Sequence, residues 1–327
     1  MSTERSKSKP RIALPLGDPA GIGPEIVLKV LADVEMRQLV DFHVVGEAAA
    51  LKPHIKAAGI NVDISEDAIT IAGFPPVQLH TVSQLGIGKW GLGEISALTG
   101  RACYEYARAA IRLAIEGSVD AVVAAPHTEV SVHEAGINFS GYPGLVALET
   151  GTPLNQTFLM LMSPVYRVVH VTLHESLSSA LGRLTEDRIL NALVATREAL
   201  TGLGIPEGRI AVCGINPHAG ENGAMGFEDQ VVVEPAVVRA KALGVNAFGP
   251  YSADALFADR EYDAYLAMYH DQGHIPVKAV SPRQASAITI GTPLLFGSVA
   301  HGSALDIAGI GKANPEALKQ AIRNLTP

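Results

Sequence analysis

Three histidines occupy equivalent places in the sequence, each a few residues after a short apolar run. His174 lies in HVTLHES, His218 in GINPHAGE and His270 in AMYHDQGH. If the three runs are strands of one α/β sheet, their carboxyl ends mark the edge where such sheets bind ligands. Three neutral imidazoles would favour a borderline metal such as Zn²⁺ and leave coordination positions open for a substrate oxygen. A single histidine is more often structural, so the shared position is what favours a metal site.

A glycine-rich segment near the N-terminus is the second candidate. GDPAGIGPE (17–25) follows the first apolar run and begins a helical pattern, with Pro24 at a plausible first helical position. It is either a strand-to-helix turn or a loop that approaches a ligand. The sequence has no G-x-S-x-G elbow, no P-loop and no G-x-G-x-x-G fingerprint, which removes the commonest hydrolase, phosphotransferase and Rossmann interpretations.

Predicted strands and predicted helices, which must position the histidines and the glycine-rich segment, alternate along the chain. Continuous apolar runs of this kind suit strands that are covered on both faces. The predicted strands are 11–16, 41–46, 120–126, 157–163, 167–173, 209–215 and 265–270, and the predicted helices are 24–36, 93–117 and 185–204. The last helix carries a threonine start signal and a glycine stop signal. The alternation predicts an α/β fold with a largely parallel sheet.

Composition limits the partners. The chain has 327 residues, of which 48% are hydrophobic, enough for two domains. Its formal charge of −8, without a Lys/Arg-rich run, argues against nucleic acid or an anionic membrane and favours a small molecule. Cys103 and Cys213 lie in apolar surroundings and are interpreted as reduced core residues. A polar N-terminus and the lack of a membrane-length apolar run predict a cytoplasmic protein.

Five segments together resemble one enzyme family. They are GDPAGIGPE (17–25), NPHAGENGAMGFED (216–229), GPYSADALF (249–257), AMYHDQG (267–273) and HGSALDIAG (301–309). In this order they are similar to the 4-hydroxythreonine-4-phosphate dehydrogenases. The resemblance implies a two-domain fold like that of isocitrate and isopropylmalate dehydrogenases, with the active-site cleft between the domains. It further implies a homodimer with a shared active site and a divalent metal, expected to be zinc, held by His174, His218 and His270.

The same resemblance divides the chain and suggests its cofactor. Residues 10–125 and 290–327 would form the cofactor-side domain, and 126–289 the domain for metal, substrate and dimerisation. HGSALDIAG resembles the adenosine-binding loop of decarboxylating β-hydroxyacid dehydrogenases. The implied cofactor contacts are His301, Gly302, Ala304, Asp306, Ile307 and Asn314. Asp306 could accept hydrogen bonds from ribose hydroxyls and would repel the extra phosphate of NADP, so NAD is preferred.

Departures from the family pattern concern the substrate. Gly141-Tyr142-Pro143-Gly144 stands where the family has Gly-His-Thr-Glu, and Ala287 and Phe296 stand where it has a phosphate-binding Asn and Arg. Lys278 is retained. Without the guanidinium, a buried phosphate would be poorly compensated, so an unphosphorylated substrate is predicted.

Segments 126–144, 167–176 and 270–278 are similar to one branch of the family, the terephthalate cis-dihydrodiol dehydrogenases. These oxidise 1,2-dihydroxy-3,5-cyclohexadiene-1,4-dicarboxylate to protocatechuate. Tyr142 and Phe296 would then be apolar walls, while Lys278 and Arg283 would supply charge for a carboxylate. Asp271, beside an implied metal ligand, could orient His270 or relay a proton, or it could be a helix cap.

Three alternatives stay open at this point. The first is oxidation of 4-hydroxythreonine 4-phosphate or another phosphorylated hydroxy acid, with the phosphate held by other residues of the chain. The second is a ligand-binding homologue without turnover. The third is a dehydrogenase for a related dihydrodiol, because specificity depends on a few side chains in the pocket.

Overall fold

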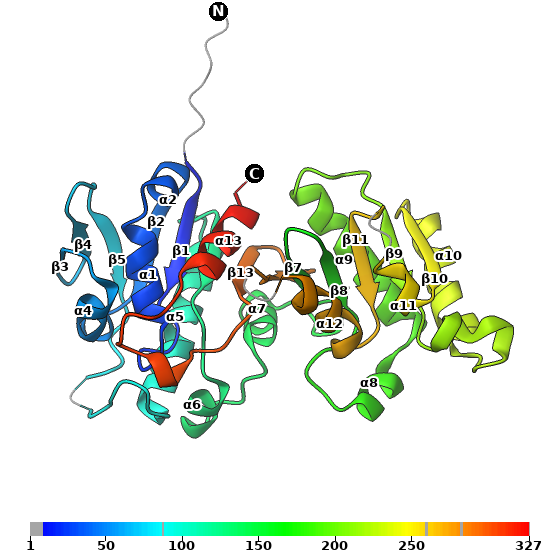
Figure 1. Ribbon diagram of the computed structural model, residues 1–327, viewed down its shortest axis with the longest axis horizontal. Helices are drawn as coiled ribbons and strands as arrows, with labels where there is room; N and C mark the ends of the chain where they lie inside the picture. Colours follow the sequence, from blue (N-terminus) through cyan, green and yellow to red (C-terminus); the bar gives the residue numbers. More distant parts are fainter. Residues whose placement is uncertain (1–8, 87, 259–260, 282–283, 327) are drawn as a thin grey trace, which may run out of the picture. The chain divides into compact units, whose positions relative to one another are not determined.

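The chain forms two compact units, each built on a sheet. A computed structural model describes residues 9–326 except 87, 259–260 and 282–283 (Figure 1). Unit 1 comprises Met1–Phe139 and Phe296–Thr326, and unit 2 comprises Ser140–Leu295. These divisions differ from the domain boundaries at 125/126 and 289/290 that the sequence suggested. The predicted domain boundaries stay a prediction.

Unit 1 contains a mixed sheet with a parallel centre. Its strand order is β13 (Leu295–Val299), β6 (Ala121–Ala124), β1 (Arg11–Pro15), β2 (Asp41–Gly46), β5 (Val77–Thr81), β4 (Ala68–Ile71) and β3 (Val62–Ile64). β6, β1, β2 and β5 run parallel, whereas β4 and β3 are antiparallel additions at the edge. The central strands are buried almost throughout, which explains their continuous apolar runs.

Helices pack around this sheet. They are α1 (Gly23–Leu31), α2 (Val34–Leu39), α3 (Ala48–Leu51), α4 (Ile55–Ala58), α5 (Ala97–Ile115), α6 (Glu129–Glu134) and α13 (Glu316–Asn324), with 3₁₀ turns η1 (Lys52–His54) and η4 (Leu305–Ile307). The helix predicted over 24–36 is wrong in its length, because it is divided into α1 and α2. The Asp33 carboxylate accepts a hydrogen bond from the Met36 amide at 3.1 Å and so begins a new helix.

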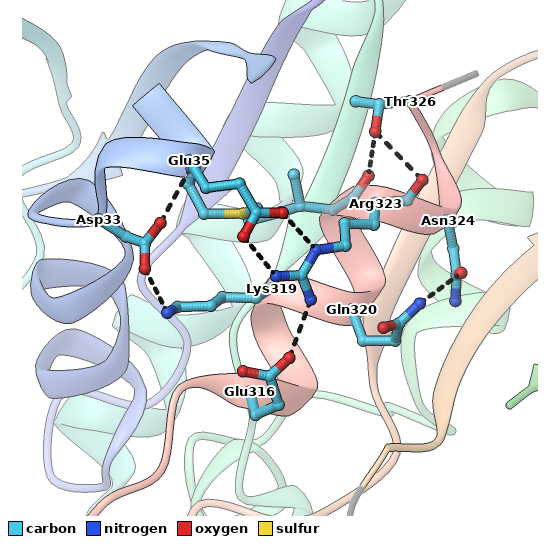
Figure 2. A network of polar contacts seen from close by, with 10 residues as sticks. Asp33, Glu35, Glu316, Lys319, Gln320, Arg323, Asn324 and Thr326 are labelled. Carbon is cyan, nitrogen blue, oxygen red and sulfur yellow. Dashed lines mark hydrogen bonds and ion pairs between the residues drawn. The ribbon is translucent and has the colours of Figure 1, made fainter. Parts of the chain in front are cut away.

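The C-terminal helix is joined to α2 and the turn before it by charged side chains. Figure 2 shows Arg323 between Glu35 and Glu316, with nitrogen–oxygen distances of 3.0 and 2.8 Å. Lys319 forms a second ion pair with Asp33. The C-terminal segment, distant in sequence, is therefore anchored to the N-terminal part of unit 1.

Unit 2 is built on the remaining strands. Its strand order is β10 (Ala247–Tyr251), β9 (Ile210–Cys213), β11 (Ala264–Ala267), β8 (Arg167–His170), β7 (Phe158–Met162) and β12 (Ser286–Ile290). The first four strands are parallel, and β7 is antiparallel to both β8 and β12. Its helical segments are α7 (Tyr142–Thr150), α8 (Leu177–Arg183), α9 (Glu186–Gly202), η2 (Pro217–Gly223), η3 (Asp229–Val233), α10 (Glu234–Ala242), α11 (Ala253–Leu256) and α12 (His270–Val280).

The predicted α/β class and the seven predicted strands are confirmed. So are the start and stop of α9: the Thr185 hydroxyl accepts a bond from the Arg188 amide at 3.2 Å, and Gly204 follows with φ +82°. Short strands such as β3 to β5 were not predicted, because their burial is interrupted by exposed residues. Cys103 and Cys213 are both buried, as expected. Among the described residues, no helix is both long and apolar enough to cross a membrane.

Candidate functional site

The three histidines follow three neighbouring strands of unit 2. β9, β11 and β8 are adjacent and parallel, although they are not consecutive in the chain. His218 comes after β9, His270 after β11 and His174 after β8. Because parallel strands end at the same edge of their sheet, all three residues belong to that edge, which is where α/β proteins bind ligands.

A cavity lies at this edge. It has a volume of about 330 Å³, and its lining includes His174, His270 and Asp271. The ring centres of His174 and His270 are 5.6 Å apart. The volume suits a small ligand. A larger cavity of about 650 Å³ in unit 1, lined by residues such as Lys9 and Phe74, contains none of the predicted site residues.

Asp271 fixes the orientation of His270. His270 is the first residue of α12, and its Nδ1 lies 2.7 Å from Asp271 Oδ1. An ionised carboxylate can only accept, so Nδ1 carries a proton; in the neutral form of the ring, Nε2 is then the nitrogen with the lone pair. The residue at the helix cap is Tyr269, without a side-chain cap bond. The geometry therefore favours the orienting role of Asp271 over the capping role.

His218 lies in a loop of unusual backbone conformation. Five consecutive residues from His218 to Asn222 have positive φ angles. The buried Asp229 holds the start of the loop by accepting bonds from the Ile215 and Asn216 amides at 2.7 and 3.0 Å. Within the described parts of the chain, no three His, Cys, Asp or Glu residues are grouped so that they could hold a metal ion. The structure thus brings His174 and His270 together, but not all three predicted ligands.

The sequence did not single out Asp254, a carboxylate on α11 close to His218. A hydrogen bond from Ser252 and one from the Ala255 amide lower the pKa of Asp254. The carboxylate is therefore an anion beside a predicted ligand. GPYSADALF contains this aspartate, and its resemblance could have drawn attention to it.

The predicted substrate residues are distributed over several elements. Lys278 is exposed on α12, eight residues after His270 and so on the same helical face. Tyr142 begins α7 and is 3% exposed, whereas Phe296 on β13 of unit 1 is fully buried. Ala287 on β12 is also buried. Arg283 lies outside the described residues. The roles of these side chains toward a substrate stay predictions.

Two further histidines beside this cavity were missed. His274 lies one helical turn after His270, and its ring stacks on that of His270 with centres 3.8 Å apart. Its Nδ1 is 3.0 Å from Nε2 of His170, the last residue of β8. Burial holds the pKa of His170 well below its ordinary value, so this ring is neutral. Burial is the main cause that lowers the pKa of His274 to about 3. The spacing of 270 and 274 was the available sequence signal.

In unit 1 the two predicted ligand loops touch each other. The Ile22 amide of GDPAGIGPE donates to the Ser303 carbonyl of HGSALDIAG at 2.9 Å. A Cβ at Gly21 would lie 2.5 Å from Ser303 Cβ, so only glycine permits this approach. The glycine-rich segment therefore supports the 301–309 loop as well as beginning α1.

The implied cofactor residues lie in and after that loop. His301, Gly302, Asp306 and Asn314 are exposed, Ala304 has φ +42°, and Ile307 ends η4. Asn314 Oδ1 accepts a bond from the Glu316 amide at 2.9 Å, which gives it a structural role at the start of α13.

The glycine-rich segment 17–25 and the 301–309 loop each contain a buried polar atom without a hydrogen-bond partner. In the described part of the chain, Ser303 Oγ and Asp18 Oδ2 are buried without a hydrogen-bond partner. Buried polar groups normally have partners, so these atoms fit a site that receives a polar ligand.

Comparisons with known proteins agree with this architecture. The sequence profile of a family described as pyridoxal phosphate biosynthetic protein PdxA matches residues 38–325. A 1,2-dihydroxy-3,5-cyclohexadiene-1,4-dicarboxylate dehydrogenase from Comamonas sp is 43% identical over 312 residues, 95% of this chain and 96% of its own.

Two solved structures are similar over nearly the whole chain. A 4-hydroxythreonine-4-phosphate dehydrogenase from Klebsiella pneumoniae is 35% identical, with a TM-score of 0.84 and 98% of both chains covered. A terephthalate 1,2-cis-dihydrodiol dehydrogenase from Burkholderia xenovorans LB400 is 38% identical, with a TM-score of 0.69 over 97% of this chain and 98% of that one.

Proposed function

Because this chain belongs to the pyridoxal phosphate biosynthetic protein PdxA family, we propose that it is an NAD-linked, metal-dependent dehydrogenase of terephthalate 1,2-cis-dihydrodiol. Its named relatives are dehydrogenases, so the chain is an oxidoreductase that acts on a CH–OH group. The observation that carries the proposal is the cavity that His174 and His270 line, with Asp271 leaving the Nε2 lone pair of His270 available.

The proposed reaction oxidises a secondary hydroxyl β to a carboxylate. The carbon would lose a hydride, for which NAD⁺ would be the acceptor, and the hydroxyl would lose a proton, which gives a β-keto acid. Its C–C bond to the carboxylate then breaks and CO₂ leaves; the electron pair of that bond forms the double bond that completes the aromatic ring, and the former ketone oxygen takes up a proton as a phenol hydroxyl of protocatechuate. The gain of aromaticity favours this second step.

The donor atoms of the predicted ligands suit the groups that this chemistry requires, and the structure brings two of those ligands, His174 and His270, together. Imidazole nitrogens are suitable ligands for Zn²⁺, and His174, His218 and His270 would hold it. Bound there, the metal would supply Lewis-acid stabilisation of negative charge on the substrate oxygen. The 301–309 loop and Asn314 would hold NAD, which accepts the hydride.

Lys278 would bind a substrate carboxylate. Its ammonium is exposed on the face of α12 that also carries His270. The buried Ala287 and Phe296 offer no donor to a phosphate, and a single ammonium compensates a phosphate poorly. An unphosphorylated dicarboxylate therefore suits these residues better than a phosphate ester. Asp271 contributes by holding His270 in one tautomer.

NADH formation by the zinc-loaded protein tests the proposal. The protein is offered terephthalate cis-dihydrodiol and, separately, 4-hydroxythreonine 4-phosphate. Turnover of the diol alone supports it. Lys278→Met should then raise the KM for the diol at least about tenfold, the value of one charge-assisted hydrogen bond. Lys241→Met, an exposed lysine on α10, is the matched control and should leave KM unchanged.

The second candidate is a dehydrogenase of a phosphorylated hydroxy acid. Lys278 is retained, and the Klebsiella pneumoniae relative is named for 4-hydroxythreonine 4-phosphate. Turnover of the phosphate ester alone would establish this candidate and refute the argument from Ala287 and Phe296.

The cofactor preference and the assembly belong to the same proposal. The exposed Asp306 would repel the additional phosphate of NADP, so Asp306→Ala should reduce the preference for NAD over NADP. A homodimer with a shared active site is also proposed. Light scattering on the purified protein would then give twice the mass of 34.3 kDa.

A further inference from the structure

Three histidine rings form a continuous row from the cavity into the core of unit 2. His270 and His274 stack almost in parallel, with 3.8 Å between ring centres and an interplanar angle of 11°. His274 and His170 follow, with centres 4.5 Å apart and a nitrogen–nitrogen distance of 3.0 Å. We call these three residues the histidine row. It joins the start of α12 to the end of β8.

Gly273 makes the row possible. A Cβ at this position would lie 2.4 Å from His170 Nε2 and 2.8 Å from Val168 Cγ1. Only glycine therefore lets α12 approach β8 closely enough for His274 to reach His170. The His170 ring occupies the space that a side chain at 273 would need.

The hydrogen bonds determine the tautomers of the row. His170 is neutral, and its Nδ1 faces the Leu159 carbonyl at 3.4 Å, which can only accept. Its proton is therefore on Nδ1, and its Nε2 accepts from His274. His274 Nδ1 also faces the His270 carbonyl at 3.3 Å, a second acceptor. Both contacts require the proton of His274 on Nδ1, which leaves its Nε2 unprotonated.

We propose that His274, fixed by His170, is a positioning residue that holds the ring of His270 for metal binding. The inference rests on the proposed function, because it assigns His270 to the metal. Asp271 fixes the edge of the His270 ring through Nδ1, and His274 covers its face. Rotation of His270 about its Cβ–Cγ bond would disrupt both contacts. Its Nε2 lone pair is consequently presented in one direction before a metal arrives.

The tautomers can be measured without metal. In metal-free, full-length protein labelled with ¹⁵N-histidine, long-range proton–nitrogen spectra at neutral pH should show His170 and His274 protonated on Nδ1 only. Signals are assigned by their loss in His274→Leu and His170→Gln variants. A proton on Nε2 of His274 would overturn the inference, whatever the protein's activity.

Zinc affinity tests the consequence. Dissociation constants for Zn²⁺ alone are measured by chelator competition for the wild-type protein and for His274→Phe and His274→Leu. His274→Leu loses both the ring and the donor, and should bind zinc about 10–100-fold more weakly. His274→Phe keeps an aromatic ring against His270, so its dissociation constant for Zn²⁺ should lie between those of the wild type and His274→Leu. Ile275→Ala, at the next and 63% exposed position of α12, is the control and should bind as the wild type does.

The outcomes separate the two proposals. Folded His274→Leu protein that binds zinc within about twofold of Ile275→Ala would refute the positioning role and leave the metal site standing. A wild-type protein without zinc affinity would refute the proposed function, whereas the tautomer measurement would still decide whether the row exists as described.

Discussion

Replacing Gly273 by alanine tests the close packing of α12 on β8. The added methyl group would lie 2.4 Å from His170 Nε2, about 1 Å closer than ordinary van der Waals contact. Val168, at 2.8 Å, closes the space on another side. Because both neighbours are fixed in β8, the helix must move away from the strand, and the hydrogen bond between His170 and His274 is stretched or lost.

The expected cost follows from these contacts. Overpacking a core position destabilises by about 1–3 kcal/mol. A buried imidazole nitrogen left without its donor adds about 1–3 kcal/mol. The better helix propensity of alanine offsets up to about 1 kcal/mol. Gly273→Ala should therefore lower the free energy of unfolding by about 3 kcal/mol, near the middle of the range of about 1–6 kcal/mol that these contributions span.

Urea unfolding followed by circular dichroism measures this difference. Gly202→Ala is the matched control, since Gly202 also lies in a helix of unit 2 and no atom lies within 4 Å of its added Cβ. It should be neutral or stabilise by up to about 1 kcal/mol. If the free energies of unfolding of Gly273→Ala and Gly202→Ala differ by less than about 0.5 kcal/mol, the packing argument for Gly273 is wrong.

Three further predictions concern other parts of the chain. Burial alone would raise the pKa of Asp33, but the hydrogen bond from Lys319 lowers it, and the net shift is downward. The ion pair between Asp33 and Lys319 therefore stabilises the fold at pH values above the pKa of an unfolded aspartate, and this stabilisation is lost in acid. Lys319→Met should cost about 1 kcal/mol at pH 7, and its difference from wild type in urea unfolding should shrink as the pH falls below the ordinary pKa of an aspartate and through the lowered pKa of Asp33. Tyr106→Phe removes a 2.7 Å hydrogen bond to the buried Glu47 and should cost about 1–3 kcal/mol; equal stability would refute this. Burial raises the pKa of the Cys213 thiol to about 12, so alkylation at pH 8 should label it only after unfolding.

The sequence predicted the strands that lead to the candidate site because their residues are apolar on both faces. β8, β9 and β11 are buried throughout or nearly so, and such runs are visible without tertiary information. The position of a histidine after each run was likewise a property of the sequence. The short edge strands gave no such signal, since their residues alternate between buried and exposed.

Other features of the site depend on which segments become neighbours. The order β9, β11, β8 is not the order of the chain, and only the folded sheet makes these three strands adjacent. His170 and His274 are 104 residues apart, and their hydrogen bond exists because Gly273 lets a helix approach a strand. Gly21 and Ser303 meet in the same way. Local patterns determine the elements and the residues at their ends, whereas contacts between distant segments arise from packing, which no local pattern encodes.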